Sequence, residues 1–313
     1  MARAPRPRRG PGSRAADTAR TPTDDDSHAA ADPALARGTE DMYRDPTLYD
    51  FEFRDRTRDV RWYRRFARDV ADRSDPTGPI LELGAGSGRV TLPLARDGHH
   101  VIALDRMAPM LERLSERLAD APTPSGPLRD RVRVLQGDMT RIPLRPSSVA
   151  AVLAPFNALM HLYTWRDLLA CFRQVRRVLR PGGAFAFDVE LPDLGWLTWD
   201  RDVRHSVGKF RHPRTGETMV YSTNHTYDPQ TQICHIRIYY DHVPPGRRGF
   251  DPHAPPTEPA AVFHLAHRQI FPEEVRALTE LAGLELCSLD GDFRGRPLAP
   301  GVQSMVAVCR RPA

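Results

Sequence analysis

The sequence lacks several features that mark particular protein classes. It contains one lysine, Lys209, and four cysteines that are too widely spaced for a zinc or redox motif: Cys171, Cys234, Cys287 and Cys309. The histidines also lack the compact spacing of metal ligands. We therefore expect no metal site, and free thiols in a reducing compartment.

Long hydrophobic runs are also missing. No apolar segment approaches the roughly 20 residues that span a bilayer. The basic start, MARAPRPRRGPGSR, is not followed by the apolar region of a secretory signal. We expect a cytoplasmic protein without membrane contact. The preference for arginine over lysine, with 30 prolines, suggests a GC-rich bacterial genome.

A concentrated positive charge is absent as well, although the net charge is +5. Residues 1–20 carry six arginines, but residues 21–40 are acidic, so the two stretches nearly cancel. No dense basic stripe with interleaved aromatic residues follows. Nucleic acid is therefore a disfavoured partner.

The pattern along the chain predicts a disordered tail and one domain. Residues 1–40 have almost no large apolar side chains and are expected to be disordered. In residues 41–313, short apolar strands alternate with helices, which indicates a doubly wound α/β fold with a mostly parallel sheet covered on both faces. Strands are expected near 79–83, 101–104, 131–136, 149–154, 184–188, 284–289 and 303–309, which makes seven.

A different pattern interrupts this order at about 198–270. Four segments there resemble antiparallel strands, at 203–211, 218–227, 232–242 and 261–270, with a proline-rich connection at 244–258. We expect this antiparallel insertion after the fifth strand to form a lid on the α/β domain.

A glycine-rich turn stands where an open α/β sheet binds its ligand. Glu82-Leu-Gly84-Ala85-Gly86-Ser-Gly88 lies between a predicted strand and a predicted helix, and Asp105 ends the next strand. The carboxylate suits the ribose hydroxyls of an adenosine cofactor. The order G-x-G-x-G differs from the dinucleotide order G-x-G-x-x-G, and Glu82 suits a cationic ligand better than a pyrophosphate. A turn without a ligand is the alternative, against which Glu82 and Asp105 argue.

These motifs resemble those of class I methyltransferases that use S-adenosylmethionine (SAM). The stretch LELGAGSGRVTLPLARDGHHVIALD is similar to the family's first motif, Gly137-Asp138-Met139 to its adenine-contacting turn, and Leu179-Arg-Pro-Gly-Gly183 to a further signature. The insertion, with His267-Arg-Gln-Ile-Phe-Pro272, resembles small-molecule N- and O-methyltransferases of the glycine-sarcosine and amino-sugar type. The resemblance implies SAM as cofactor and transfer to N or O of a small molecule, in specialised metabolism.

The resemblance also implies site residues. The cofactor is expected to contact Tyr49, Arg58, Glu82, Gly84, Ala85, Gly86, Asp105, Arg106, Asp138, Met139 and Pro155, with Arg58 pairing with the methionyl carboxylate. In the loop after the fourth strand, Asn157 is expected to orient the ligands and His161 to act as general base, titrating near pH 6.5. Reserve candidates for acceptor contacts include Asp188, Glu190, Tyr221 and His267.

Two other functions stay open from the sequence. One is an RNA- or protein-directed methyltransferase, which would need a basic groove. The other is a non-catalytic SAM-binding protein. The acceptor and the oligomeric state also stay open, and a homodimer is among the possibilities.

Overall fold

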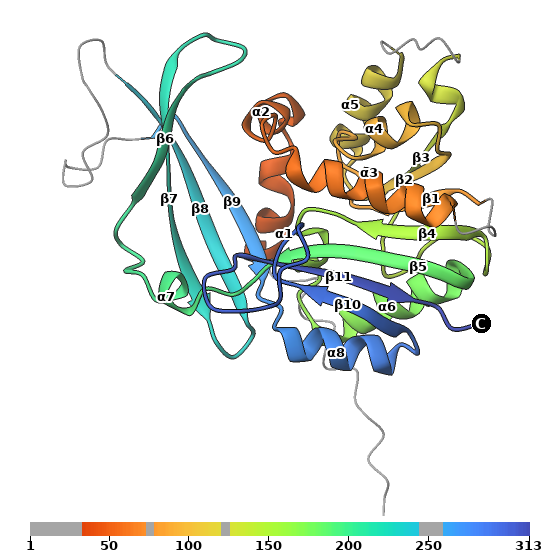
Figure 1. Ribbon diagram of the computed structural model, residues 1–313. Coiled ribbons are helices and arrows are strands. Elements are labelled where there is room, and N and C mark those ends of the chain that lie inside the picture. Colours follow the sequence, from red (N-terminus) through yellow and green to blue (C-terminus); the bar gives the residue numbers. More distant parts are fainter. Residues whose placement is uncertain (1–32, 73–77, 120–125, 244–258) are drawn as a thin grey trace, which may run out of the picture.

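A computed structural model describes residues 33–72, 78–119, 126–243 and 259–313. It contains a seven-stranded sheet and a separate four-stranded sheet (Figure 1). Residues 1–32 of the predicted tail and the proline-rich connection at 244–258 lie outside the described residues. None of the helices in the described ranges has both the length and the apolar character of a membrane span.

The seven-stranded sheet has the order β10-β11-β5-β4-β1-β2-β3. β11 runs antiparallel to both of its neighbours, β10 and β5, and the other strands run parallel to one another. The strands are β1 (Ile80–Leu83), β2 (Val101–Asp105), β3 (Val132–Gln136), β4 (Val149–Ala154), β5 (Leu179–Glu190), β10 (Glu285–Asp290) and β11 (Ser304–Arg310). The doubly wound fold predicted from the sequence is confirmed, and its topological switch point lies between β1 and β4.

Helices cover both faces of this sheet (Figure 1). One face packs against α3 (Arg58–Ala71), α4 (Thr91–Arg96) and α5 (Ala108–Ala119). The opposite face packs against α6 (Trp165–Val178) and α8 (Pro272–Leu281). Short 3-10 helices are η3 (Leu128–Asp130) and η4 (Ala158–His161). Because β1 and β4 are buried along their whole length, their apolar sequences do not alternate.

The insertion after β5 begins with the short helix α7 (Leu194–Leu197) and forms an antiparallel sheet, here called the inserted sheet. Its strands, in spatial order, are β6 (His205–Arg211), β7 (Thr218–Asp228), β8 (Ile233–His242) and β9 (Ala261–Arg268). Arg268 at the end of β9 pairs with Glu274 of α8 at 2.7 Å. This ion pair joins the inserted sheet to the α/β body.

The N-terminal segment lies between the inserted sheet and the body (Figure 1). It consists of α1 (Pro33–Glu40), η2 (Asp41–Tyr43) and α2 (Pro46–Glu52). Residues 33–40 were expected in a disordered tail, but α1 packs against β9. Leu35 and Ala266 share a buried cluster, and a Cβ on Gly38 would lie 2.5 Å from the Ala266 Cβ. One leucine and a close backbone approach therefore order a segment with little apolar surface.

Candidate active site

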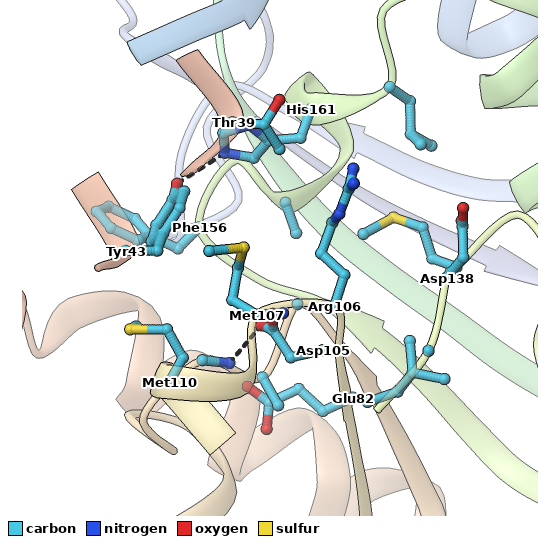
Figure 2. Close-up of a pocket in the computed structure, with 18 of the residues that line it drawn as sticks. Thr39, Tyr43, Glu82, Asp105, Arg106, Met107, Met110, Asp138, Phe156 and His161 are labelled. Carbon is cyan, nitrogen blue, oxygen red and sulfur yellow. Dashed lines mark hydrogen bonds between the residues drawn. The ribbon is translucent and has the colours of Figure 1, made fainter. Parts of the chain in front are cut away.

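A cavity of about 390 Å³ lies at the carboxyl ends of β1 to β4. The N-terminal segment contributes one side and the strand-end loops the others (Figure 2). Its lining consists of Leu35, Ala36, Thr39, Glu40, Tyr43, Tyr49, Glu82, Gly84, Ala85, Gly86, Ser87, Arg89, Val90, Leu104, Asp105, Arg106, Met107, Met110, Gly137, Asp138, Met139, Thr140, Pro155, Phe156, Ala158, His161, Leu162, Tyr163 and Asp167. A ligand here would be enclosed by two parts of the chain far apart in sequence.

The glycine loop forms the floor of this cavity. Gly84 and Gly86 have φ values of 67° and 55°, which L side chains rarely adopt. A Cβ on Gly84 would also lie 2.9 Å from the Ala158 Cβ. The glycines therefore set both the turn and the close approach of the β4 loop.

Asp105 ends β2 beside this loop. Its Oδ2 accepts a hydrogen bond from the Gly86 N–H at 2.8 Å, and its Oδ1 accepts one from the Met107 N–H at 2.8 Å (Figure 2). Burial raises the pKa of Asp105, and the two backbone bonds oppose that rise. A carboxylate oxygen can accept more than one bond, so the oriented group can still accept from a diol.

Glu82 provides a second carboxyl group in the cavity wall. The side chain is 2% exposed, and its Oε2 accepts from the Thr91 hydroxyl at 2.5 Å. Burial raises the pKa of Glu82 to about 8. A cationic ligand would favour the ionised form of this carboxyl group.

The turn after β3 places Asp138 on another part of the lining. Its Oδ1 accepts from the backbone N–H and the hydroxyl of Thr140, both at 2.7 Å. Among the described residues, none donates a hydrogen bond to Oδ2, which is therefore suited to an amino group. Figure 2 shows the Arg106 side chain extending between Asp138 and His161.

Helix α2 closes over the glycine loop. Asp45 caps its first turn by accepting from the Leu48 N–H at 3.0 Å. Farther along the helix, Asp50 accepts from the Ser87 hydroxyl at 2.5 Å and from Arg117 at 3.2 Å. These contacts hold Tyr49 against the cavity.

His161 lies where η4 meets the N-terminal segment. Its Nε2 is 2.7 Å from the Tyr43 hydroxyl oxygen (Figure 2). Its ring centroid is 5.0 Å from that of His267. Burial, with a smaller effect of Arg106, lowers the pKa of His161 to about 4. The imidazole is therefore neutral at physiological pH, in contrast to the expectation of a group titrating near pH 6.5.

A family model described as a methyltransferase domain matches residues 80–183, from β1 to the start of β5. This match covers the glycine loop, Asp105, Asp138 and His161. The chain belongs to the class I SAM-dependent methyltransferases.

Several members of this family are similar over longer stretches. The cypemycin N-terminal methyltransferase of a Streptomyces species is 25% identical over 234 residues, which cover 74% of this chain and 82% of that protein. The CcbJ methyltransferase from Streptomyces caelestis is 26% identical, with a TM-score of 0.64, covering 82% of this chain and 90% of CcbJ. The putative methyltransferase YqeM of Bacillus subtilis is 28% identical over 136 residues, about half of its length.

Most of the expected cofactor contacts of this methyltransferase line the cavity. Arg58 is the exception, because its side chain is exposed on α3 and does not line it. Arg89 does line it, pairs with Asp59 at 2.5 Å, and lies 4.5 Å from the Phe156 ring centroid. The signal for Arg89 was its position directly after the glycine loop, where the backbone turns towards the ligand.

The expected ligand-orienting residue Asn157 does not line the cavity. It adopts a left-handed conformation, with φ 64°, and its Oδ1 accepts from the Glu190 N–H at 2.8 Å. The preceding Phe156, with φ 55°, lines the cavity instead. Asn157 thus shapes the β4 loop that presents Phe156.

Sequence reasoning missed the contribution of α1 and η2 to the site. Leu35, Thr39 and Tyr43 line the cavity, and the hydroxyls of Thr39 and Tyr163 share a hydrogen bond of 2.6 Å. An aromatic residue at 43 is the only signal in the sequence, because α1 makes its contacts with β9 and with Tyr163, more than 100 residues away.

Proposed function

We propose that this SAM-dependent methyltransferase transfers its methyl group to the nitrogen of a small-molecule amine. The supporting observation is the enclosure of the cavity at the strand ends by the N-terminal segment, which leaves a compact space beside the glycine loop. The inserted sheet packs on the other side of this segment. The cypemycin relative is named for methyl transfer at an N-terminus, where a peptide chain carries an amine.

The cavity lining supports an assignment for each part of the cofactor. Asp105 would hold the ribose hydroxyls, and Asp138 the adenine amino group, with Met139 and Arg106 beside the ring. Glu82 and Arg89 would hold the charged methionyl end. Tyr49, Ala85 and Pro155 would close the cavity around it.

SAM supplies a methyl group that is already activated by its sulfonium. The residues of this chain therefore have to align the acceptor nitrogen, and good alignment contributes roughly 7–11 kcal/mol. Neutral His161 accepts from the Tyr43 hydroxyl in this proposal, which leaves the phenol oxygen facing the cavity as an acceptor for an amine N–H. The acceptor nitrogen has to be neutral to attack the methyl carbon, and the methylated ammonium that forms loses its proton to water. His161 then orients Tyr43 and does not itself remove the proton.

The test is methyl transfer with matched acceptors. The protein is incubated with SAM and pairs of amines and alcohols of the same carbon skeleton, and S-adenosylhomocysteine (SAH) release is measured. We expect transfer to amines that Asp105→Ala abolishes and Asp130→Ala, on an exposed turn, leaves unchanged. Transfer to alcohols alone, or undiminished transfer by Asp105→Ala, contradicts the proposal.

A further inference from the structure

The inserted sheet presents a continuous group of rings towards α2. This aromatic face consists of Phe210, Tyr221, Tyr240 and Phe263. Tyr240 lies at its centre, with ring centroids 5.8, 5.6 and 5.4 Å from those of Phe210, Tyr221 and Phe263. Rings in such an arrangement offer both apolar contact and the negative π faces that attract cations.

Glu52, at the end of α2, places a carboxyl group against this face. Its Oε1 accepts a hydrogen bond from the Tyr240 hydroxyl. Among the described residues, no arginine, lysine or histidine lies within ion-pair distance of Glu52. Burial raises the pKa of Glu52 to about 7, with a further contribution from Asp45. The carboxyl group is thus withdrawn from water without a compensating cation.

The charged groups around Tyr221 are also mainly negative. Glu52 and Glu190 raise the pKa of Tyr221, after the larger effect of burial, and Arg56 opposes them. The Arg56 guanidinium itself lies 4.9 Å from the Phe156 ring centroid. Tyr221 is therefore near two carboxyl groups and one guanidinium, and that guanidinium also contacts Phe156.

The aromatic face adjoins the cavity at one residue, Tyr43. Tyr43 packs against the same cluster, lines the cavity and carries the hydroxyl that meets His161. A molecule that reaches Tyr43 from the side of the inserted sheet would therefore pass the rings and Glu52.

We propose that Glu52 and the ring of Tyr221 form a subsite that first binds the acceptor as a protonated amine, which loses this proton before its nitrogen reaches the transferable methyl group. This inference rests on the proposed function, which makes the acceptor an amine. Binding of a cation by Glu52 and Tyr221 can be measured without methyl transfer. An ammonium group gives Glu52 the cation that it lacks, and the π faces add an attraction that a neutral hydroxyl does not receive. The subsite would select amines over alcohols of equal size.

Benzylammonium and benzyl alcohol are suitable probes, since they differ in charge but little in shape. Each is titrated calorimetrically into the full-length protein, with and without SAH. We expect benzylammonium to bind about tenfold more tightly than benzyl alcohol, as cation–π attraction and one carboxylate contact would give. Glu52→Gln should remove the preference, and Tyr221→Leu should reduce it. The matched control Glu280→Gln, exposed on α8, should keep it.

The outcomes separate this inference from the proposed function. A preference for benzylammonium that Glu52→Gln retains, or equal binding of both probes by the parent protein, overturns the subsite. Tyr240→Phe keeps the Glu52 carboxylate and removes only its hydrogen-bond donor. If this variant still prefers benzylammonium, the charge of Glu52 is responsible for the preference. If the variant loses the preference, the proposed role of that charge is contradicted. Failure to bind SAH contradicts the proposed function alone, because the probes are also measured without it.

Discussion

Glu82 allows a quantitative prediction about cofactor binding. The carboxyl group is buried, receives a hydrogen bond from Thr91, and has a pKa of about 8. SAM carries a sulfonium and an ammonium group, so the ionised form of Glu82 should be the form that binds it well. We expect SAM affinity to rise with pH up to about 8, and Glu82→Gln to remove that rise.

The size of the effect follows from the ionised fraction. With a pKa of about 8, about 1% of Glu82 is ionised at pH 6, about 10% at pH 7 and about half at pH 8. Affinity should therefore increase nearly tenfold from pH 6 to 7 and about fivefold from pH 7 to 8. Thr91→Val removes the donor that stabilises the carboxylate and should shift this profile to higher pH.

The same shift affects folding in the opposite direction. Between pH 4.5 and about 8, the folded protein keeps a proton on Glu82 that the unfolded chain has already lost. The free energy of unfolding should fall through this window, by up to about 5 kcal/mol, since one pKa unit corresponds to about 1.4 kcal/mol. Glu82→Gln should flatten this part of the stability profile.

Calorimetric titration with SAM from pH 6 to 8.5 measures the affinity at each pH and so tests the prediction. The ionisation of SAM itself is common to the parent and to Glu82→Gln, so the difference between their profiles isolates Glu82. Identical slopes for the two proteins would refute the reasoning and place Glu82 outside the binding step.

Three further predictions follow from the site. His161→Ala should slow methyl transfer by a factor that stays constant from pH 6 to 9, since the imidazole is already neutral there, and a loss that shrinks with rising pH would instead indicate a general base. Asp50→Ala should weaken SAM binding about five- to tenfold in calorimetry by releasing α2 from the glycine loop, whereas unchanged affinity would show that α2 does not cover the cofactor. Gly38→Val should lower the melting temperature by several degrees because its side chain would overlap Ala266, and an unchanged melting temperature would contradict the packing of α1 on β9.

The part of the site that the sequence predicted well is local. The positions of Gly84, Gly86 and Asp105 follow from a strand, the turn after it and the end of the next strand. All three residues lie within one stretch of about 25 residues. The apolar strands themselves reveal a sheet covered on both faces. The structure confirms the fold that these patterns indicate.

The remaining parts depend on contacts between distant segments. Residues 33–40 are ordered by Ala266, and no composition rule detects one glycine that allows a close approach. The sequence analysis named Arg58 for the methionyl carboxylate, but it is Arg89 that the ion pair with Asp59 holds against the cavity. The pKa of His161 depends on how deeply η4 is covered by Tyr43 and His267, which its neighbours in sequence do not show.

Helix α2 contacts the body through Asp50 and the inserted sheet through Glu52, two residues apart. This short helix therefore borders the cofactor cavity through Tyr49 and the proposed acceptor subsite through Glu52. If the cofactor and the amine favour the same position of α2, each must tighten the binding of the other by the same factor. Loading the protein with SAH should then tighten amine binding, and the amine should tighten SAH binding by the same factor.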